Sequence, residues 1–290
     1  RAAGGGLGSG WSRTRVRLVP AGMIDFETTG LGPKLLLVHG LGSTRNAWAP
    51  VLPLLAPHRE LIILDLPGHG ASPAEDDSGT FAGLVRSVRA FMEAQGLAGV
   101  DMVGSSLGAR IVLELARQGG VGAVVALDPG GFWQGWERTY AGTSLAASAG
   151  LLRLSKPLIP ALAHNPVSRT ALLAQLSARP WALDGALVER ELKSLAETRT
   201  VDALIQDLTT GPAQQGPAAP DSGPVVIGWG AHDRLCLPQQ AHRAAAAFPT
   251  ARLHWFKGSG HFPLWDQPEE AAQVILDATG GRWREGARAS

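Results

Sequence analysis

A serine between two glycines is the first candidate for chemistry in this chain of 290 residues. The segment Gly104–Gly108 reads Gly-Ser-Ser-Leu-Gly, with an apolar run before it and a helical pattern from Ile111 onwards. Glycines two positions to either side of Ser106 permit a tight strand-to-helix turn that lifts its hydroxyl clear of a sheet. The free amides of the following helix would then point at whatever the hydroxyl attacks. The pattern predicts that Ser106 is a nucleophile.

The competing hydroxyl is that of Ser105, one position earlier. It lacks a glycine two positions to either side, and it would still belong to the preceding strand. The Gly-x-Ser-x-Gly pattern alone is weak, because a chain with 37 glycines meets it readily by chance. Ser106 is favoured because a candidate acid and a candidate base follow it in the chain, each directly after a predicted strand.

A serine hydroxyl becomes nucleophilic at neutral pH only when a base accepts its proton. The candidate base is His261, in a Gly-Ser-Gly-His-Phe-Pro segment that follows the last predicted strand. The glycines before it predict a loop that is free to aim the imidazole across the edge of the sheet. The alternatives are that His261 is an ordinary surface histidine, or that His39 is the base. We expect His39 to be buried and to hydrogen-bond its own loop.

The base in turn needs a carboxylate that fixes its tautomer. The candidate is Asp233, which follows a predicted strand and gives the order serine, aspartate, histidine along the chain. Because catalytic groups gather beyond the carboxyl ends of parallel strands, we expect Ser106, Asp233 and His261 on one rim of the sheet. Asp128 competes, since it follows the strand next after the serine. We expect Asp128 instead to stabilise the loop that comes after it.

The oxyanion that develops during attack on a carbonyl needs hydrogen-bond donors that are already aimed at it. One donor is the backbone amide of Leu107, at the start of the helix after the serine. The other is the amide of Leu41 in the loop His39–Gly42, whose glycines let the backbone approach a ligand. Asp65 and His69, around a Pro-Gly-His-Gly turn, are interpreted as supports of that turn rather than as reacting groups.

The composition suits a globular chain, with 45% hydrophobic and 18% charged residues. A formal net charge of +1 gives no reason to expect nucleic acid as a partner. Cys236 is the only cysteine, so neither an intrachain disulfide nor a cysteine-based metal cluster can form. No metal site and no cofactor are expected, because the remaining histidines lack acidic or cysteine partners at ligand spacing: His58, His164, His232, His242 and His254.

The elements that must position these residues follow a strand–helix rhythm. Apolar runs predict strands at 34–39, 60–66, 100–105, 121–127, 224–229 and 251–256, and a loose alternation predicts an opening hairpin of 13–20 and 23–28. Helical patterns lie between most of the later strands. We therefore predict an α/β protein with a mostly parallel, eight-stranded sheet flanked by helices.

The rhythm breaks between residues 132 and 222, which hold several helical stretches and no convincing strand. We predict an all-helical lid there, inserted into a core domain of residues 12–131 and 223–281, and flexible ends at 1–11 and 282–290. No apolar window is long enough for a membrane span and no signal peptide is visible, so we expect a cytoplasmic protein. The chain begins without methionine, so the sequence leaves open whether an earlier segment was removed. It also leaves the oligomeric state open.

Taken together, these motifs resemble the α/β-hydrolase superfamily. The resemblance implies that fold, a Ser106-Asp233-His261 triad and a helical lid at residues 132–222. It does not fix the substrate. It runs from about residue 22 to residue 279 and rests on these stretches: Leu37–Gly40, Asp65–Ser72, Gly104–Gly108, Gly230 with Asp233, and Gly260 with His261.

Departures from subfamilies of that superfamily narrow the chemistry. A serine nucleophile at position 106 disfavours dehalogenases and epoxide hydrolases, which work through an alkyl-enzyme ester on aspartate. Phe262 follows the base where the meta-cleavage carbon–carbon hydrolases carry tryptophan. Ala109 follows Gly108, where cofactor-free haloperoxidases commonly have a second glycine.

We therefore expect a cofactor-free serine hydrolase that cleaves carboxylic esters through an acyl-enzyme intermediate. The lid segment is rich in large apolar residues and has no cluster of charge, so the substrate should be a small molecule with a largely apolar acyl group. The pocket is predicted to include Gly40, Trp133, Trp136 and Phe262. The alternatives are hydrolysis of thioesters, lactones or carbon–carbon bonds at the same triad, and a non-catalytic small-molecule receptor.

Overall fold

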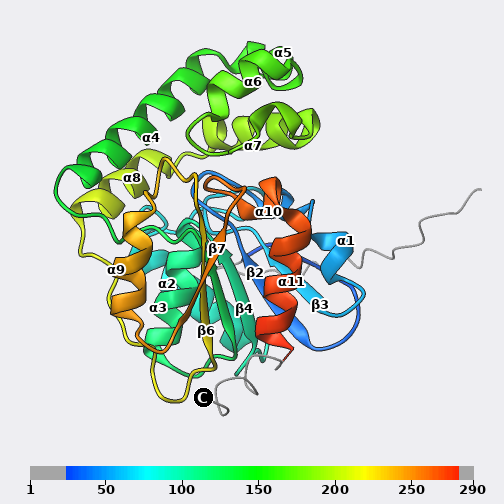
Figure 1. Ribbon diagram of the computed structural model, residues 1–290, viewed down its shortest axis with the longest axis vertical. Helices are drawn as coiled ribbons and strands as arrows, with labels where there is room; N and C mark the ends of the chain where they lie inside the picture. Colours follow the sequence, from blue (N-terminus) through cyan, green and yellow to red (C-terminus); the bar gives the residue numbers. More distant parts are fainter. Residues whose placement is uncertain (1–23, 281–290) are drawn as a thin grey trace, which may run out of the picture.

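A computed structural model describes residues 24–280 of the chain, which are built on one sheet with helices around it (Figure 1). The strand order is β1-β3-β2-β4-β5-β6-β7, and only β1 runs antiparallel to its neighbour. The strands are β1 (Phe26–Thr29), β2 (Lys34–Val38), β3 (Glu60–Leu64), β4 (Asp101–Ser105), β5 (Val124–Leu127), β6 (Val225–Gly230) and β7 (Arg252–Phe256).

This sheet confirms the predicted α/β class with a mostly parallel sheet. Between residues 24 and 280 the sheet has seven strands rather than the eight expected. The strand predicted at 13–20 lies outside the described residues, as do the ends predicted to be flexible at 1–11 and 282–290. The second strand of the expected hairpin is β1, which begins at Phe26 rather than at residue 23 and pairs with β3.

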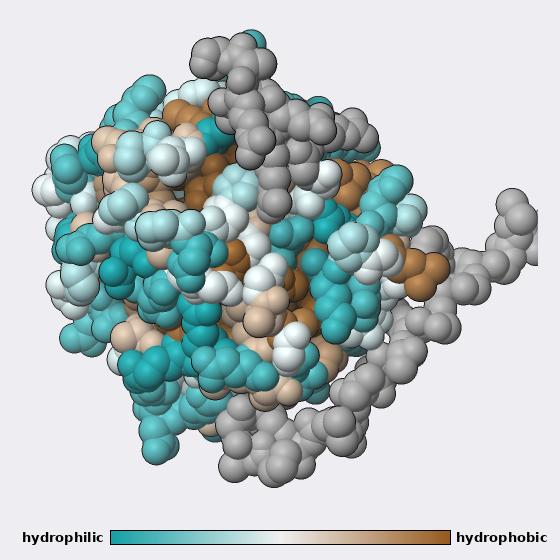
Figure 2. All heavy atoms as spheres, turned by 90° about the horizontal axis from the view of Figure 1, so that it is seen from below, coloured by the Kyte–Doolittle hydropathy of each residue, from teal (hydrophilic) through white to brown (hydrophobic). Residues whose placement is uncertain are grey.

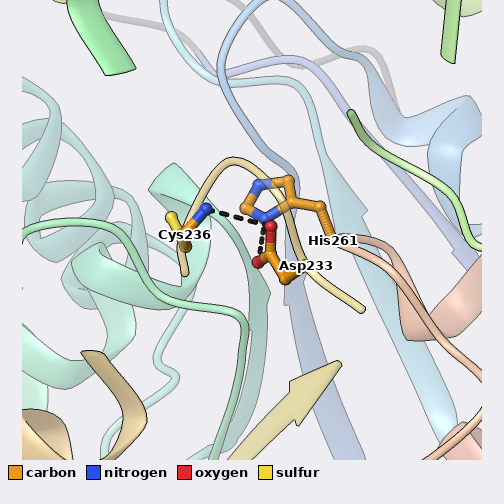
Figure 3. Close-up of side chains that lie close together, drawn as sticks. All are labelled: Asp233, Cys236 and His261. Atoms are coloured by element: carbon orange, nitrogen blue, oxygen red, sulfur yellow. Dashed lines mark hydrogen bonds and ion pairs between the residues drawn. The ribbon is translucent and has the colours of Figure 1, made fainter. Parts of the chain in front are cut away.

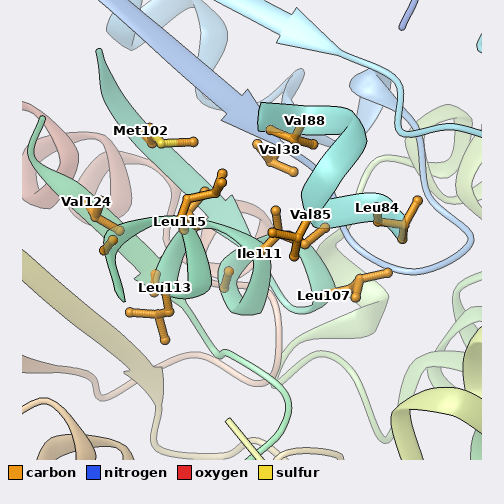
Figure 4. Packing of buried hydrophobic residues seen from close by; sticks show 14 of the residues in the cluster. Val38, Leu84, Val85, Val88, Met102, Leu107, Ile111, Leu113, Leu115 and Val124 are labelled. Carbon is orange, nitrogen blue, oxygen red and sulfur yellow. The ribbon is translucent and has the colours of Figure 1, made fainter. Parts of the chain in front are cut away.

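Both faces of the sheet are covered because its strands are apolar on both sides. Along β2, Leu36 and Val38 join one core while Leu35 and Leu37 join the other, as the alternation of side chains in a strand requires. The first core is closed by α2 (Phe81–Ala94), α3 (Leu107–Gln118) and α9 (Gln239–Ala247), and the second by α1 (Leu52–Leu55) and α11 (Pro268–Thr279). Figure 4 shows side chains of α2 and α3 meeting those of β2, β4 and β5.

All the α-helices between β5 and β6 form a separate layer, which we name the helical segment (residues 136–210). It lies over the edge of the sheet where the parallel strands end (Figure 1), while the opposite end of the molecule is a mainly hydrophilic surface with small hydrophobic patches (Figure 2). None of the helices described is both long and apolar enough to cross a membrane. The helices of the segment are α4 (Trp136–Leu154), α5 (Ile159–His164), α6 (Pro166–Leu173), α7 (Gly185–Glu197) and α8 (Val201–Thr210).

Shorter helices complete the chain. A 3-10 turn at Arg45–Trp48 follows β2, and the four-residue α10 (Pro263–Asp266) follows the loop after β7. Two further 3-10 turns, Lys156–Leu158 and Pro180–Ala182, link helices of the helical segment.

The turn from β4 into α3 is packed directly against β2. A Cβ atom on Gly108 would lie 2.1 Å from the carbonyl oxygen of Val38, and one on Gly104 would lie 2.2 Å from the carbonyl oxygen of Gly108. Neither contact is possible between real atoms. Glycine is therefore required at both positions because α3 crosses the backbone of β2 at this distance.

We predict opposite effects of alanine at two helical glycines. Gly108→Ala should lower the free energy of unfolding by about 3 kcal/mol or more, because backbone must move to make room. Gly150→Ala, in α4 with nothing within 4 Å of the added carbon, should raise the free energy of unfolding by up to about 1 kcal/mol. Urea unfolding measures both. Equal effects of the two substitutions would show that the close contact at Gly108 does not govern the turn.

Candidate active site

Ser106 is the single residue between β4 and α3, and it has a backbone conformation that non-glycine residues rarely adopt. Its φ is 56° and its ψ is −112°. The turn is held because the Ser106 amide donates to the carbonyl of Leu127 at 2.9 Å and the Ser106 carbonyl accepts from the amide of Arg110 at 3.0 Å. The hydroxyl of the neighbouring Ser105 is instead buried without a hydrogen-bond partner among the described residues. Of the two serines, Ser106 is therefore the one whose hydroxyl reaches the other candidate residues.

The loop after β7 brings His261 to that hydroxyl. Nε2 of His261 is 2.8 Å from Oγ of Ser106, and Nδ1 of His261 is 2.7 Å from Oδ2 of Asp233. A carboxylate can only accept hydrogen bonds, so Nδ1 of His261 carries the proton that faces Asp233. Nε2 of His261 is then free to accept the hydrogen bond from the serine hydroxyl. This is the tautomer that a general base needs.

Asp233 is buried beyond the carboxyl end of β6, and backbone amides donate hydrogen bonds to it (Figure 3). Its Oδ1 accepts from the amides of Leu235 and Cys236 at 2.8 and 2.9 Å, which leaves Oδ2 for His261. The loops that carry the two side chains touch, since a Cβ on Gly230 would lie 1.8 Å from the carbonyl oxygen of Gly260. Such close packing fixes the position of Asp233 relative to His261.

Asp128, the competing acid, lies at the end of β5 with a φ of 47° and is fully buried. Its Oδ1 accepts from the amide of Gly230 at 2.8 Å, so it ties two neighbouring strands together rather than the loop that follows it, which had been expected. Its Oδ2 has no donor among the described residues. Burial, and then the negative charge of Asp233, raise the pKa of Asp128 well above its ordinary value. The charged form of Asp128 is therefore disfavoured.

The loop after β2 approaches Ser106 closely. A Cβ on Gly40 would lie 3.2 Å from Cβ of Ser106. Within residues 24–280, neither the amide of Leu41 nor that of Leu107 donates a hydrogen bond to another group. Two unused amides beside the serine hydroxyl can bind a developing oxyanion, and the positive end of the α3 dipole adds to their attraction.

His39 supports this loop, as expected. Its Nδ1–H donates to the carbonyl of Gly40 at 2.8 Å, and its Nε2 accepts from the amide of Leu66 at 2.9 Å. Burial lowers the pKa of His39, which keeps the ring neutral and both bonds intact. Both ring nitrogens are occupied, so His39 is not free to act as a base.

Asp65 and His69 also lie within the scaffold rather than beside Ser106. Asp65 accepts from Nε and Nη2 of Arg45 at 2.9 and 2.6 Å. Burial alone would raise the pKa of Asp65, but the hydrogen bond from Arg45 outweighs it and the pKa is lowered. Burial lowers the pKa of His69 to about 3, so that ring is neutral too.

Sequence reasoning missed Asp266, a buried acid that fixes the base loop to the helical segment. Its Oδ2 accepts from the amides of Gly260 and Ala178, each at 2.8 Å, and its Oδ1 accepts from Oγ of Ser177 at 2.5 Å. The amide of His261 itself donates to the carbonyl of Leu176 at 2.9 Å. No local pattern reveals the partners in the helical segment, because Ser177 and Ala178 lie 89 and 88 residues away from Asp266 in the chain.

The predicted pocket residues lie in different surroundings. The ring of Phe262 is 4.9 Å from that of His261, and Gly40 touches Ser106 as described above. Trp133 is almost fully buried in the sheet core. Trp136 does not fit the prediction, since it is 65% exposed and its ring contacts Tyr140 at the start of α4. Trp136 lies on the solvent side of the first turn of that helix, and we leave it out of the pocket.

Asp233, Cys236 and His261 also form a cluster whose donor atoms all lie within 4.8 Å of one another (Figure 3). Metal ligation needs a thiolate and a free imidazole nitrogen. Burial raises the pKa of the Cys236 thiol well above its ordinary value, so the thiol stays protonated. The nearer nitrogen of His261 is already bonded to Asp233. The donor set therefore fits an acid–base pair better than a metal site.

Comparisons with known proteins identify the family of this chain. The model of the alpha/beta hydrolase family matches residues 35–274. An uncharacterized protein of Mycobacterium tuberculosis is 28% identical over 272 residues, which cover 86% of this chain and 76% of that protein. The 2-hydroxy-6-oxononadienedioate/2-hydroxy-6-oxononatrienedioate hydrolase of Escherichia coli is 25% identical over 276 residues, which cover 88% of this chain and 90% of that enzyme.

A solved structure shares the fold. The thermophilic esterase of Thermogutta terrifontis superposes with a TM-score of 0.68 at 20% identity, covering 93% of this chain and 97% of the esterase. The sequence relatives and the family match support a hydrolase. Because the family model matches most of the chain, from β2 to α11, this protein belongs to the alpha/beta hydrolase family.

Proposed function

We propose that this protein is a cofactor-free serine hydrolase that cleaves carboxylic esters with largely apolar acyl groups. Ser106 is the nucleophile, His261 the general base and Asp233 the acid that orients it. The observation that carries the proposal is the hydrogen-bond chain from Oγ of Ser106 through both nitrogens of His261 to Asp233, at 2.8 and 2.7 Å.

The reaction proceeds in two halves. Nε2 of His261 accepts the proton of Ser106 as Oγ attacks the ester carbonyl, and the amides of Leu41 and Leu107 bind the oxyanion. The imidazolium then protonates the leaving alkoxide, so that the alcohol departs and Ser106 carries the acyl group. A water molecule, deprotonated by His261, attacks the acyl-enzyme, and the carboxylic acid leaves as Ser106 regains its proton.

The surroundings of the site support an apolar acyl group. Partly buried leucines of the helical segment, Leu145, Leu176 and Leu195, pack between the cores of the sheet and the segment, beside Leu41 and Phe262. In this proposal residues 132–222 are a lid inserted into a core domain of residues 12–131 and 223–281. The lid excludes water and supplies apolar walls above Ser106.

A second candidate is hydrolysis of a carbon–carbon bond at the same triad. It is favoured by the similarity to the Escherichia coli hydrolase, and it is weakened by Phe262 next to the base. A panel of esters, thioesters, lactones and a 2-hydroxy-6-oxo dienoate discriminates between them. The ester proposal requires the highest kcat/KM on an ester with an apolar acyl group. Binding without repeated turnover of any member would indicate a receptor.

We predict that Ser106→Ala lowers kcat for a short p-nitrophenyl ester by at least about 10⁴-fold, because the acyl-enzyme cannot form. The matched control is Ser105→Ala, which removes the adjacent buried hydroxyl and should leave kcat within about threefold of the parent. Circular dichroism checks that both variants fold. Turnover retained in a folded Ser106→Ala variant would contradict the nucleophile assignment.

The two neighbouring acids should respond differently to asparagine. Asp233→Asn should lower kcat by about 10³- to 10⁴-fold, because the amide cannot hold His261 in the tautomer with Nδ1 protonated. Asp128→Asn should cost less than about tenfold, since an amide resembles the uncharged acid and still accepts from the amide of Gly230. The measurement is kcat at neutral pH. A larger loss at Asp128 than at Asp233 would reverse the assignment of the acid.

A further inference from the structure

The turn that carries the Leu41 amide is covered by α7 of the helical segment. The turn closes where the amide of Ser43 donates to the carbonyl of Gly40 at 3.3 Å, and Gly42 inside it has a φ of +65°. No backbone hydrogen bond to a strand fixes Leu41 within the described chain. His39 holds the preceding residue, Gly40, and α7 packs on the outside of the turn.

Two residues one helical turn apart on α7 make that contact. Leu195 lies directly on Gly42, since a Cβ there would be 2.3 Å from its Cδ1 atom. Glu191 accepts a hydrogen bond from Oγ of Ser43 at 2.5 Å and is almost fully buried. Residues at this spacing lie on the same face of a helix, so α7 holds the turn with one apolar and one polar contact.

The Glu191 carboxyl has the surroundings of an uncharged acid. Its Oε1 is buried without a hydrogen-bond donor among the described residues. The charged groups around it are Arg190 on its own helix and Asp65 at the end of β3, and the charge of Asp65 is already paired with Arg45. Burial raises the pKa of Glu191 to about 8. A buried carboxylate with one undonated oxygen would be costly, so ionisation favours hydration of the group and movement of α7.

We propose that neutral Glu191 is a positioning residue for the oxyanion site, because through Ser43 it holds the turn that aims the Leu41 amide at the reacting carbonyl. The inference rests on the proposed function. It assigns to the helical segment a direct part in transition-state stabilisation, besides covering the pocket. Its consequence is an additional loss of activity as pH rises through about 8, where the folded carboxyl ionises.

The test compares the pH profiles of kcat and KM for a p-nitrophenyl ester between pH 6 and 10 in Glu191→Gln, Glu191→Ala and Ser43→Ala. Glutamine accepts the bond from Ser43 but does not titrate. Glu191→Gln should keep kcat at pH 7 within about threefold and move the alkaline loss upward by at least about one pH unit. Glu191→Ala and Ser43→Ala should lower kcat by about tenfold with little change in KM, because the oxyanion forms only in the transition state.

The matched control is Glu189→Gln, on the exposed side of the same helix, where the carboxylate pairs with Lys193. It should follow the parent at every pH. An unchanged alkaline loss in folded Glu191→Gln, or unchanged kcat in folded Glu191→Ala and Ser43→Ala, overturns the positioning role.

A stability measurement separates failure of this inference from failure of the proposed function. The unfolded glutamate loses its proton near pH 4.5 and the folded one near 8, so the contribution of this group is present below pH 4.5 and is lost as pH rises to 8. The Tm of Glu191→Gln should therefore rise relative to the parent across that interval. A Tm shift with no effect on kcat refutes the positioning role alone, whereas a parent that turns over no ester refutes the proposed function.

Discussion

The proposed chemistry depends on one interaction, the hydrogen-bond chain from the hydroxyl of Ser106 through the imidazole of His261 to the buried Asp233. The three side chains come from the ends of β4, β6 and β7. A parallel sheet brings these strand ends to one edge, and the close contact between Gly230 and Gly260 fixes the loops beyond it. The strained backbone of Ser106 is tolerated because α3 and β2 pack tightly around the turn.

Four of the buried acids around this edge differ in their roles because their hydrogen-bond donors differ. Asp233 accepts hydrogen bonds from two amides and an imidazole, and Asp266 accepts hydrogen bonds from two amides and two hydroxyls. Asp128 and Glu191 each keep one oxygen without a donor in the described part of the chain, and the pKa of each is raised. For these two acids, burial disfavours the charged form, and no donor to the remaining oxygen offsets that cost.

The helical segment is fixed to the sheet domain at both sides of the site. On the side of the base, Leu176 and Ser177 bond to His261 and Asp266. On the side of the oxyanion turn, Glu191 bonds to Ser43. On the proposed mechanism, a movement of the segment would therefore also move the loops that carry His261 and the Leu41 amide.

The sequence by itself determined what depends on neighbours in the chain. Glycines around Ser106 and apolar runs before each loop predicted the turn, the mostly parallel sheet and the residues that meet at its edge, because backbone sterics and side-chain periodicity are local. Only the tertiary structure decided the rest. Trp136 faces solvent, Asp128 bonds β6, and Asp266 and Glu191 join segments far apart in the chain. These outcomes depend on burial and on hydrogen-bond donors that are distant in the chain, and residue spacing in the sequence predicts neither.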